Sequence, residues 1–402
     1  MWKKLQEEWE RLFGKRDTRV YFAPGRVNLI GEHTDYNGGH VFPCALTIGT
    51  YAVVGKNEDH ALRLFSVNFP DLGTVEIPLG PMKNEREHGW TNYVKAVVWA
   101  FSDAGFDLKQ GLDIVVGGNI PAGSGLSSSA SLEVLAGTIL LEECGWKDLG
   151  APRGVELAKL TQKAENRFIG VNCGIMDQFA IAMGRKNHAV FLNTATLEYQ
   201  YLPLELSGLK LIISCSNKKR GLADSKYNER RTECENALAE LTAWSAAHPE
   251  IMKGRTFASL GDLTEQEFEQ LAEGITQPVW YKRARHAVTE NERTLKAVDA
   301  LSRGDMVSFG QLMNASHRSL KEDYEVTGME LDTLVESAWQ VPGVLGSRMT
   351  GAGFGGCTVS LVQEEAIDRF IETVGTTYEK AVGYKADFYV VSAGGGPGRI
   401  DG

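Results

Sequence analysis

The amino-acid sequence predicts an α/β protein built of two domains. The chain has 402 residues, a length that favours two domains of ordinary size. Short β-type runs alternate with longer segments in which apolar residues recur at three- and four-residue steps, as one face of a helix requires. We place the domain boundary just before a buried-type strand at 209–214, which gives domains 1–206 and 207–402.

The first domain combines short strands with amphipathic helices. Its first ten residues are charged throughout and predict an amphipathic helix rather than a signal peptide. β-type runs follow at 20–22, 41–43, 48–54, 62–66, 74–77 and 112–116. Further helices are predicted at 90–101, from 132 onward and at 155–168.

The second domain is expected to be richer in helix. Helices are predicted at 225–246, 262–273, 280–302, 305–320, 328–339 and 364–381. Strands are predicted at 209–214, 344–350, 358–362 and 387–392. The glycine-rich segment 394–398 is expected to be a flexible end.

Composition excludes several classes of function. The net charge is −10 and no long basic block occurs, which argues against a nucleic-acid partner. No stretch approaches the roughly 18 consecutive apolar residues of a membrane span. The cysteines are scattered without a C-x-x-C spacing, which predicts reduced thiols of a cytoplasmic protein rather than a zinc site or a disulfide framework; they are Cys44, Cys144, Cys173, Cys215, Cys234 and Cys357.

The stretch 117–133 has the chemistry of a phosphate-binding loop. It lies between a strand and a helix, and the first amides of a helix point outward without internal partners. Gly123 and Gly125 would let the backbone approach an anion, and three consecutive serines at 127–129 add hydroxyls. The spacing matches neither the Walker nor the Rossmann glycine pattern. An ordinary capped helix after a loop is the alternative interpretation.

The stretch 23–39 is unusually rich in directional polar groups. Glu32, His33 and Asp35 follow closely on Arg26, and such a mixture of donors and acceptors suits a polyol such as a sugar. A polar turn between strands is the alternative, and a metal site is less favoured because the spacing is not diagnostic. Farther along, Asp177 lies where a glycine-bearing segment becomes helical, a position that also suits a helix cap.

Three stretches taken together identify a family resemblance. They are 25–39, the loop 123–130 and a second glycine-rich loop at 350–357. On these stretches the chain resembles the GHMP small-molecule kinases, and within them the galactokinase family, from about residue 20 to about residue 393. The resemblance implies an N-terminal α/β domain with a mixed sheet and a C-terminal ferredoxin-like α+β domain, with the active site between them.

The resemblance also implies roles for individual residues. Asp177 matches the aspartate that accepts the proton of the sugar C1 hydroxyl, and Arg26 matches the arginine beside it. Galactose would be held by Glu32, His33, Thr34, Asp35, Gly174, Asp177 and Tyr227. ATP would be bound by Ser66, Gly123, Ser124, Gly125, Leu126, Ser127, Ser128 and Ser129. Ser129 and Glu165 match the Mg²⁺ site.

The implied reaction moves the γ-phosphoryl group of ATP to the C1 hydroxyl of α-D-galactose, the first committed step of the Leloir pathway. The transition state of such a transfer is loose, so positioning and charge stabilisation dominate. An aspartate with a pKa near 3.9 is a poor base for a sugar hydroxyl. We therefore expect Asp177 to orient the hydroxyl and to take its proton late. The expected protein is a cytoplasmic monomer acting on small molecules.

Two other functions compete with this interpretation. One is a galactose sensor without catalysis, which the complete serine loop and the presence of Arg26 and Asp177 argue against. The other is a kinase for a related substrate. The run Glu32-His33-Thr34-Asp35 favours a sugar over mevalonate or homoserine, and it leaves N-acetylgalactosamine open.

Overall fold

The computed structural model describes residues 1–121, 125–146, 153–218 and 223–400. Its larger sheet is six-stranded, in the order β13-β1-β3-β6-β4-β5. β4 runs parallel to β6 and the other pairs are antiparallel, so the sheet is mixed, as predicted. The strands are β1 (Arg19–Asn28), β3 (Pro43–Asn57), β4 (Ala61–Ser66), β5 (Val75–Pro78), β6 (Gly111–Gly118) and β13 (Gly398–Arg399).

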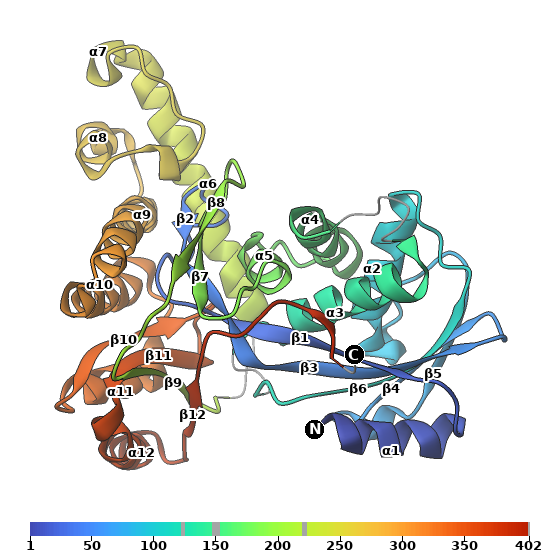
Figure 1. Ribbon diagram of the computed structural model, residues 1–402. Coiled ribbons are helices and arrows are strands. Elements are labelled where there is room, and N and C mark those ends of the chain that lie inside the picture. Colours follow the sequence, from blue (N-terminus) through green and yellow to red (C-terminus); the bar gives the residue numbers. More distant parts are fainter. Residues whose placement is uncertain (122–124, 147–152, 219–222, 401–402) are drawn as a thin grey trace.

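Helices cover both faces of this sheet (Figure 1). α1 (Trp2–Phe13) lies on one face, where Leu5 and Trp9 are buried against Val53 and Val115. The opposite face carries α2 (Thr91–Asp103), α3 (Ser128–Glu143), α4 (Val155–Lys163) and α5 (Met176–Ala182). The helix predicted at 155–168 changes at residue 164 into a π-helical turn, Ala164–Ile169.

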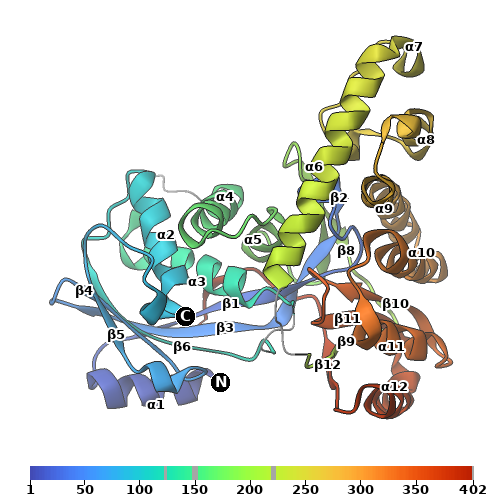
Figure 2. The same ribbon diagram turned by 180° about the vertical axis from the view of Figure 1, so that it is seen from behind.

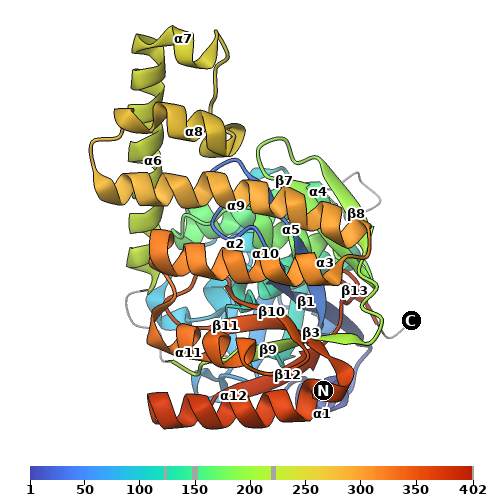
Figure 3. The same cartoon turned by 90° about the vertical axis from the view of Figure 1, so that its left-hand side faces the viewer.

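The second sheet is antiparallel, in the order β10-β11-β9-β12. Numbered along the chain, its strands lie in the order 2-3-1-4, which is the arrangement of the predicted ferredoxin-like unit. The strands are β9 (Leu209–Cys215), β10 (Val344–Thr350), β11 (Cys357–Gln363) and β12 (Asp387–Val391). α10 (Met306–Ser319), α11 (Gly328–Trp339) and α12 (Ile367–Val382) stack beside it (Figure 3).

A long helical arm projects away from both sheets (Figure 2). It consists of α6 (Ala223–Ala247), α7 (Pro249–Met252), α8 (Glu265–Leu271) and α9 (Pro278–Ser302). A small sheet of β2 (His40–Val41), β7 (His188–Asn193) and β8 (Tyr199–Pro203) lies near its base. None of the helices in the described ranges is both long and apolar enough to cross a bilayer.

The C-terminal segment corrects one expectation. Gly394 N donates to Ala45 O at 2.8 Å, and β13 pairs with β1, so residues 394–399 are tied to the larger sheet rather than forming a flexible end. The segment therefore returns from the second predicted domain to the sheet of the first. The division at 206/207 stays a prediction.

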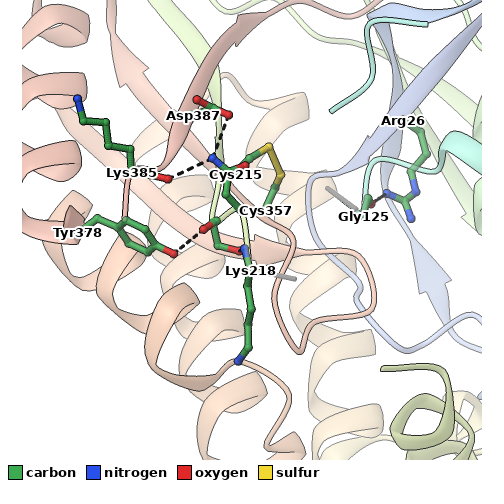
Figure 4. The surroundings of a disulfide bond; sticks show 10 residues. Arg26, Gly125, Cys215, Lys218, Cys357, Tyr378, Lys385 and Asp387 are labelled. Carbon is green, nitrogen blue, oxygen red and sulfur yellow. Dashed lines mark hydrogen bonds between the residues drawn. A yellow bond between two sulfur atoms is a disulfide. The ribbon is translucent and has the colours of Figure 1, made fainter. Parts of the chain in front are cut away.

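The cysteines correct another expectation. Cys215 and Cys357 form a disulfide bond, whereas reduced thiols were predicted (Figure 4). The two residues are 142 positions apart in sequence but lie directly opposite each other on β9 and β11, with their Cα atoms 4.2 Å apart. Cross-strand pairing, which the spacing of cysteines in the sequence does not reveal, brings them together. The other four cysteines are free.

Candidate active site

A cavity of about 320 Å³ lies where the two sheets and the helical arm meet. The first half of the chain lines it with Arg26, Glu32, His33, Asp35, Ser128, Ser129, Glu165, Gly174 and Asp177, and the second half with Tyr227, Asn228, Gly351 and Ala352. Side chains predicted from separate stretches of the sequence thus surround one space. Most of the side chains that line it are polar or charged.

Arg26 and Asp177 form a bidentate pair at this cavity. Arg26 Nε donates to Asp177 Oδ1 and its Nη2 to Oδ2, both at 2.8 Å. Arg26 is only 4% exposed, and its Nη1 donates to Gly125 O at 2.5 Å. The Ser127 hydroxyl donates to Asp177 Oδ2 as well. The guanidinium therefore ties the aspartate of α5 to the predicted phosphate loop.

Glu32 is buried in a network of donors that comes largely from the second half of the chain. Arg348 Nη2 donates to its Oε2 at 3.1 Å, and the backbone of Gly351 donates to Oε1. Burial raises the pKa of Glu32, and the positive charge of Arg348 opposes that rise. The network joins the sugar-type stretch to the second glycine-rich loop, because Arg348 Nη1 also donates to Asn28 O at 3.0 Å.

His33 presents one unsatisfied nitrogen. Its backbone is in the left-handed region, with φ of 62°, and its Nδ1 lies 2.8 Å from Tyr36 Oη. Its Nε2 is buried and makes no hydrogen bond among the described residues, although the nearby backbone of Ala352 interacts with the ring and opposes the fall in its pKa. Burial lowers the pKa of His33 to about 3, so the ring is neutral at physiological pH. A neutral imidazole with one free nitrogen suits a ligand hydroxyl.

Asp35 and Gly174 are packed against each other. A Cβ atom added to Gly174 would lie 1.8 Å from Asp35 Oδ2, so this position accepts no side chain while Asp35 stays in place. Burial, helped by the neighbouring charges of Asp177 and Glu32, raises the pKa of Asp35 to about 7. The backbone N–H of Met176 hydrogen-bonds the carboxyl group and opposes that rise.

Two further residues predicted to hold the sugar differ in position. Tyr227 reaches the cavity from α6, and its ring centroid lies 5.7 Å from that of His33 and 5.4 Å from that of Tyr36. Thr34 is fully buried and does not line the cavity. Its hydroxyl lies 2.9 Å from Gly31 O and 2.7 Å from His40 O, so it secures the turn.

A second hollow of about 230 Å³ adjoins the first. Ser66 lines it, as predicted for a nucleotide contact, together with Phe69 and Trp90. Ser128 and Ser129 line both hollows. The start of α3, with its outward-pointing amides, therefore lies between an apolar-walled space and a polar one.

The rest of the predicted phosphate loop lies beside this helix start. Ser127 adopts the left-handed conformation just before α3, and Gly125 has φ of 74°. Leu126 is fully buried, and its carbonyl accepts from the backbone of Arg26 at 3.3 Å. Gly123 and Ser124 lie outside the described residues.

The side chains predicted for Mg²⁺ are neighbours. The Ser129 side chain hydrogen-bonds Glu165, whose pKa is raised by burial and by the charge of Asp177. A hydroxyl and a buried carboxylate are oxygen donors of the kind Mg²⁺ uses beside phosphates, and a cation would offset the crowded negative charge. This pair therefore fits the ion. Within the described ranges, no group of three or more His, Cys, Asp or Glu side chains is placed to hold a metal.

Three residues near the site were not predicted from the sequence. Gln178 Nε2 donates to Glu165 Oε2 at 2.6 Å and to Glu133 Oε2 at 3.2 Å, and only its place beside Asp177 hinted at it. Tyr36 lay within the sugar-type stretch without a role. Arg348 lies inside the strand predicted at 344–350 and is fully buried. Its position in a strand was the one sequence signal, because a buried charge requires a partner.

Three family models match parts of this chain. The family model described as the galactokinase galactose-binding signature matches residues 7–56. Models of the N-terminal and C-terminal domains of GHMP kinases match residues 92–185 and 297–380. A galactokinase of Clostridium beijerinckii is 54% identical over 396 residues, covering 98% of each chain. The chain belongs to the galactokinase family of GHMP kinases.

Other members of the galactokinase family and the wider superfamily extend the comparison. A galactokinase of Clostridium acetobutylicum is 53% identical, with 99% of this chain and 98% of that protein covered. The crystal structure of Lactococcus lactis galactokinase complexed with galactose is 45% identical and superposes with a TM-score of 0.93, covering 99% of this chain and 100% of that chain. A mevalonate kinase structure, 19% identical with a TM-score of 0.63 over 93% of this chain and 98% of its own, shares the fold.

Proposed function

We propose that this chain transfers the γ-phosphoryl group of ATP to the C1 hydroxyl of α-D-galactose, giving galactose 1-phosphate and ADP. The observation that carries the proposal is that Ser128 and Ser129 line both hollows. A nucleotide with its base in the apolar-walled hollow would direct its phosphates past this helix start. Its terminal phosphate would then face the polar cavity in which Asp177 and Arg26 lie.

The polar cavity provides contacts for a hexose. The neutral His33 nitrogen without a partner, the Asp35 carboxyl and the Tyr227 side chain face one space. Gly174 leaves the room that Asp35 occupies. Directional donors and acceptors at fixed places allow a site to distinguish sugars, because a missing hydroxyl leaves a buried group unpaired.

Asp177 and Arg26 are proposed as the catalytic pair. The Arg26 fork fixes the carboxylate, and a remaining lone pair of Asp177 accepts the hydrogen of the C1 hydroxyl. In a loose transition state the hydroxyl oxygen becomes acidic only as the new bond forms, so the proton moves late. Arg26 and the first amides of α3 stabilise the charge on the transferring group.

Mg²⁺ is proposed as the cofactor, held by Ser129 and Glu165. A bound Mg²⁺ would neutralise charge on the nucleotide phosphates. Gln178 keeps the Glu165 carboxylate in place by donating to Oε2. We further propose that the protein is a cytoplasmic monomer without nucleic-acid or membrane partners. The net charge of −10 supports the absence of a nucleic-acid partner.

The test is a coupled assay of ADP release with ATP and Mg²⁺, in which galactose, glucose, N-acetylgalactosamine and mevalonate are compared as acceptors. Release is expected with galactose and not with glucose or mevalonate. Comparable release with N-acetylgalactosamine would broaden the acceptor, because it would show that the cavity admits a 2-acetamido group. Binding of galactose in calorimetry without any ADP release would instead assign the chain to the sensors.

A further inference from the structure

A chain of hydrogen bonds leads away from His33 into the second half of the molecule. Tyr36 Oη lies 2.8 Å from His33 Nδ1 and 2.7 Å from Tyr324 Oη. Tyr324 Oη in turn lies 3.2 Å from Cys234 Sγ. His33, Tyr324 and Cys234 are each less than 5% exposed. We call these four residues the His33 relay; it connects the sugar-type stretch to α6 and to the end of a π-helical turn, Leu320–Tyr324.

Tyr324 is held on several sides. Arg230 Nε donates to its carbonyl oxygen at 2.8 Å, and Arg283 donates to the carbonyl of Asp323. The Tyr324 ring packs between two histidines, with centroids 4.7 Å from His33 and 4.4 Å from His286. Its phenol oxygen is thereby fixed opposite Tyr36. Packing alone does not require that oxygen, because phenylalanine would fill the same space.

The relay has a preferred direction. Cys234 Sγ and Tyr324 Oη are hydrogen-bonded and either atom can be the donor, so the thiol hydrogen is available to Tyr324. Tyr324 then donates to Tyr36, and Tyr36 donates to His33 Nδ1. The reverse order would end on sulfur, which is a weaker acceptor than an imidazole nitrogen.

We propose that Tyr36 and Tyr324 are positioning residues for sugar recognition, because with Cys234 they hold His33 as the tautomer whose proton is on Nε2. The hydrogen bond at one ring nitrogen decides which tautomer a neutral histidine adopts. Because His33 lines the cavity and Nε2 has no partner in the described structure, this nitrogen donates to a hydroxyl oxygen of the sugar. The assignment of a sugar ligand rests on the proposed function.

The tautomer is tested directly by ¹⁵N NMR of histidine-labelled protein without ligand. The His33 signals are identified by their loss in His33→Gln. We expect the pattern of an Nε2–H tautomer in the unsubstituted protein and a mixture of tautomers in Tyr36→Phe. An Nδ1–H tautomer in the unsubstituted protein would overturn the proposed direction. This measurement does not depend on whether galactose is the substrate.

The role in recognition is tested by galactose calorimetry without nucleotide. Tyr36→Phe is expected to weaken binding about tenfold and Tyr324→Phe about threefold or more, since each loses or loosens one hydrogen bond. The KM for ATP should stay within twofold. Cys234→Ser, which keeps a donor, should bind galactose within about twofold of the unsubstituted protein.

The matched control is Tyr21→Phe. Tyr21 is 1% exposed and donates to Glu143 Oε1 on α3 at 2.6 Å. The Tyr21→Phe variant therefore loses a comparable buried hydrogen bond, and neither residue lines the cavity. Its galactose affinity should not change. Unchanged affinity in Tyr36→Phe, or equal losses for galactose and ATP, would overturn the positioning role. If the unsubstituted protein did not bind galactose, the proposed substrate would be overturned instead. The NMR measurement would still decide which tautomer the relay imposes on His33.

Discussion

Replacement of Gly174 by alanine tests the sugar site with little risk to the fold. The new Cβ would lie 1.8 Å from Asp35 Oδ2 and 2.3 Å from its Cγ, whereas ordinary contacts begin at 3.4 Å. The carboxyl group must therefore retreat by about 1.6 Å. The clash is with the end of a side chain and not with backbone, so the chain can relax by moving Asp35 alone.

That retreat removes Asp35 from hydrogen-bonding reach of a bound hexose. A hydrogen bond to a charged group contributes about 1.5–3 kcal/mol, so the loss of two such bonds costs at least about 3 kcal/mol. Galactose affinity, measured by calorimetry, should fall at least roughly 150-fold. The KM for ATP should change less than threefold, and the melting temperature should fall by only a few degrees.

A double-mutant cycle and a matched control make the Gly174 test decisive. In an Asp35→Ala background, Gly174→Ala should weaken galactose binding less than twofold, because nothing remains to be displaced. Gly395→Ala, at a glycine with no atom within 4 Å of its added Cβ, should leave binding unchanged. A full loss in the Asp35→Ala background, or galactose affinity retained in Gly174→Ala, would refute the reasoning.

Four other predictions follow from the same geometry. The kcat of Asp177→Asn should fall at least about a thousandfold while galactose still binds in calorimetry, since asparagine keeps the shape of the side chain but not the charge that pairs with Arg26. Normal turnover would contradict the catalytic role of Asp177. Burial raises the pKa of Asp35 to about 7, above the 3.8 of an exposed aspartate. Between about pH 4 and 7 the Asp35 carboxyl is therefore protonated in the folded chain and ionised in the unfolded chain, so the free energy of unfolding falls as pH rises through that window. Asp35→Asn should therefore melt at a higher temperature than the unsubstituted protein, by a margin that grows from pH 5 to pH 8 in scanning fluorimetry, and a constant margin would argue against the shift. Glu165→Gln should weaken Mn²⁺ binding to the protein–ADP complex about tenfold or more by electron paramagnetic resonance, whereas undiminished binding would place the ion elsewhere. Alkylation after denaturation without reductant should label four cysteines per chain, and labelling of all six would disprove the bond between Cys215 and Cys357.

Local patterns predicted most of the secondary structure. β10 and α11 begin and end at the predicted residues 344–350 and 328–339. The loop preceding α3 was predicted because glycine and serine at a strand–helix junction have a specific chemical meaning. The ferredoxin-like order of the second sheet came only from the family resemblance, since strand order depends on contacts between distant parts of the chain.

Long-range partners were beyond the sequence. Arg348 reaches Glu32 across 316 positions, and no spacing rule connects them. Tyr324 owes its place to a π-helical turn that helical periodicity does not predict, and the pairing of Cys215 with Cys357 depends on strand register. Residues proposed to bind a ligand were recognisable from their chemistry, whereas those that position them were not. The supporting groups contact other side chains, and only the fold decides which.

The most direct measurement of the central claim is ³¹P and ¹H NMR of the product after incubation with ATP, Mg²⁺ and galactose. The account predicts ADP and a single hexose phosphate in equal amounts, with the phosphorus coupled to the anomeric proton. Phosphate on another carbon would contradict the placement of C1 against Asp177. ADP formed with only inorganic phosphate would show that the chain hydrolyses ATP and does not transfer its phosphoryl group to the sugar.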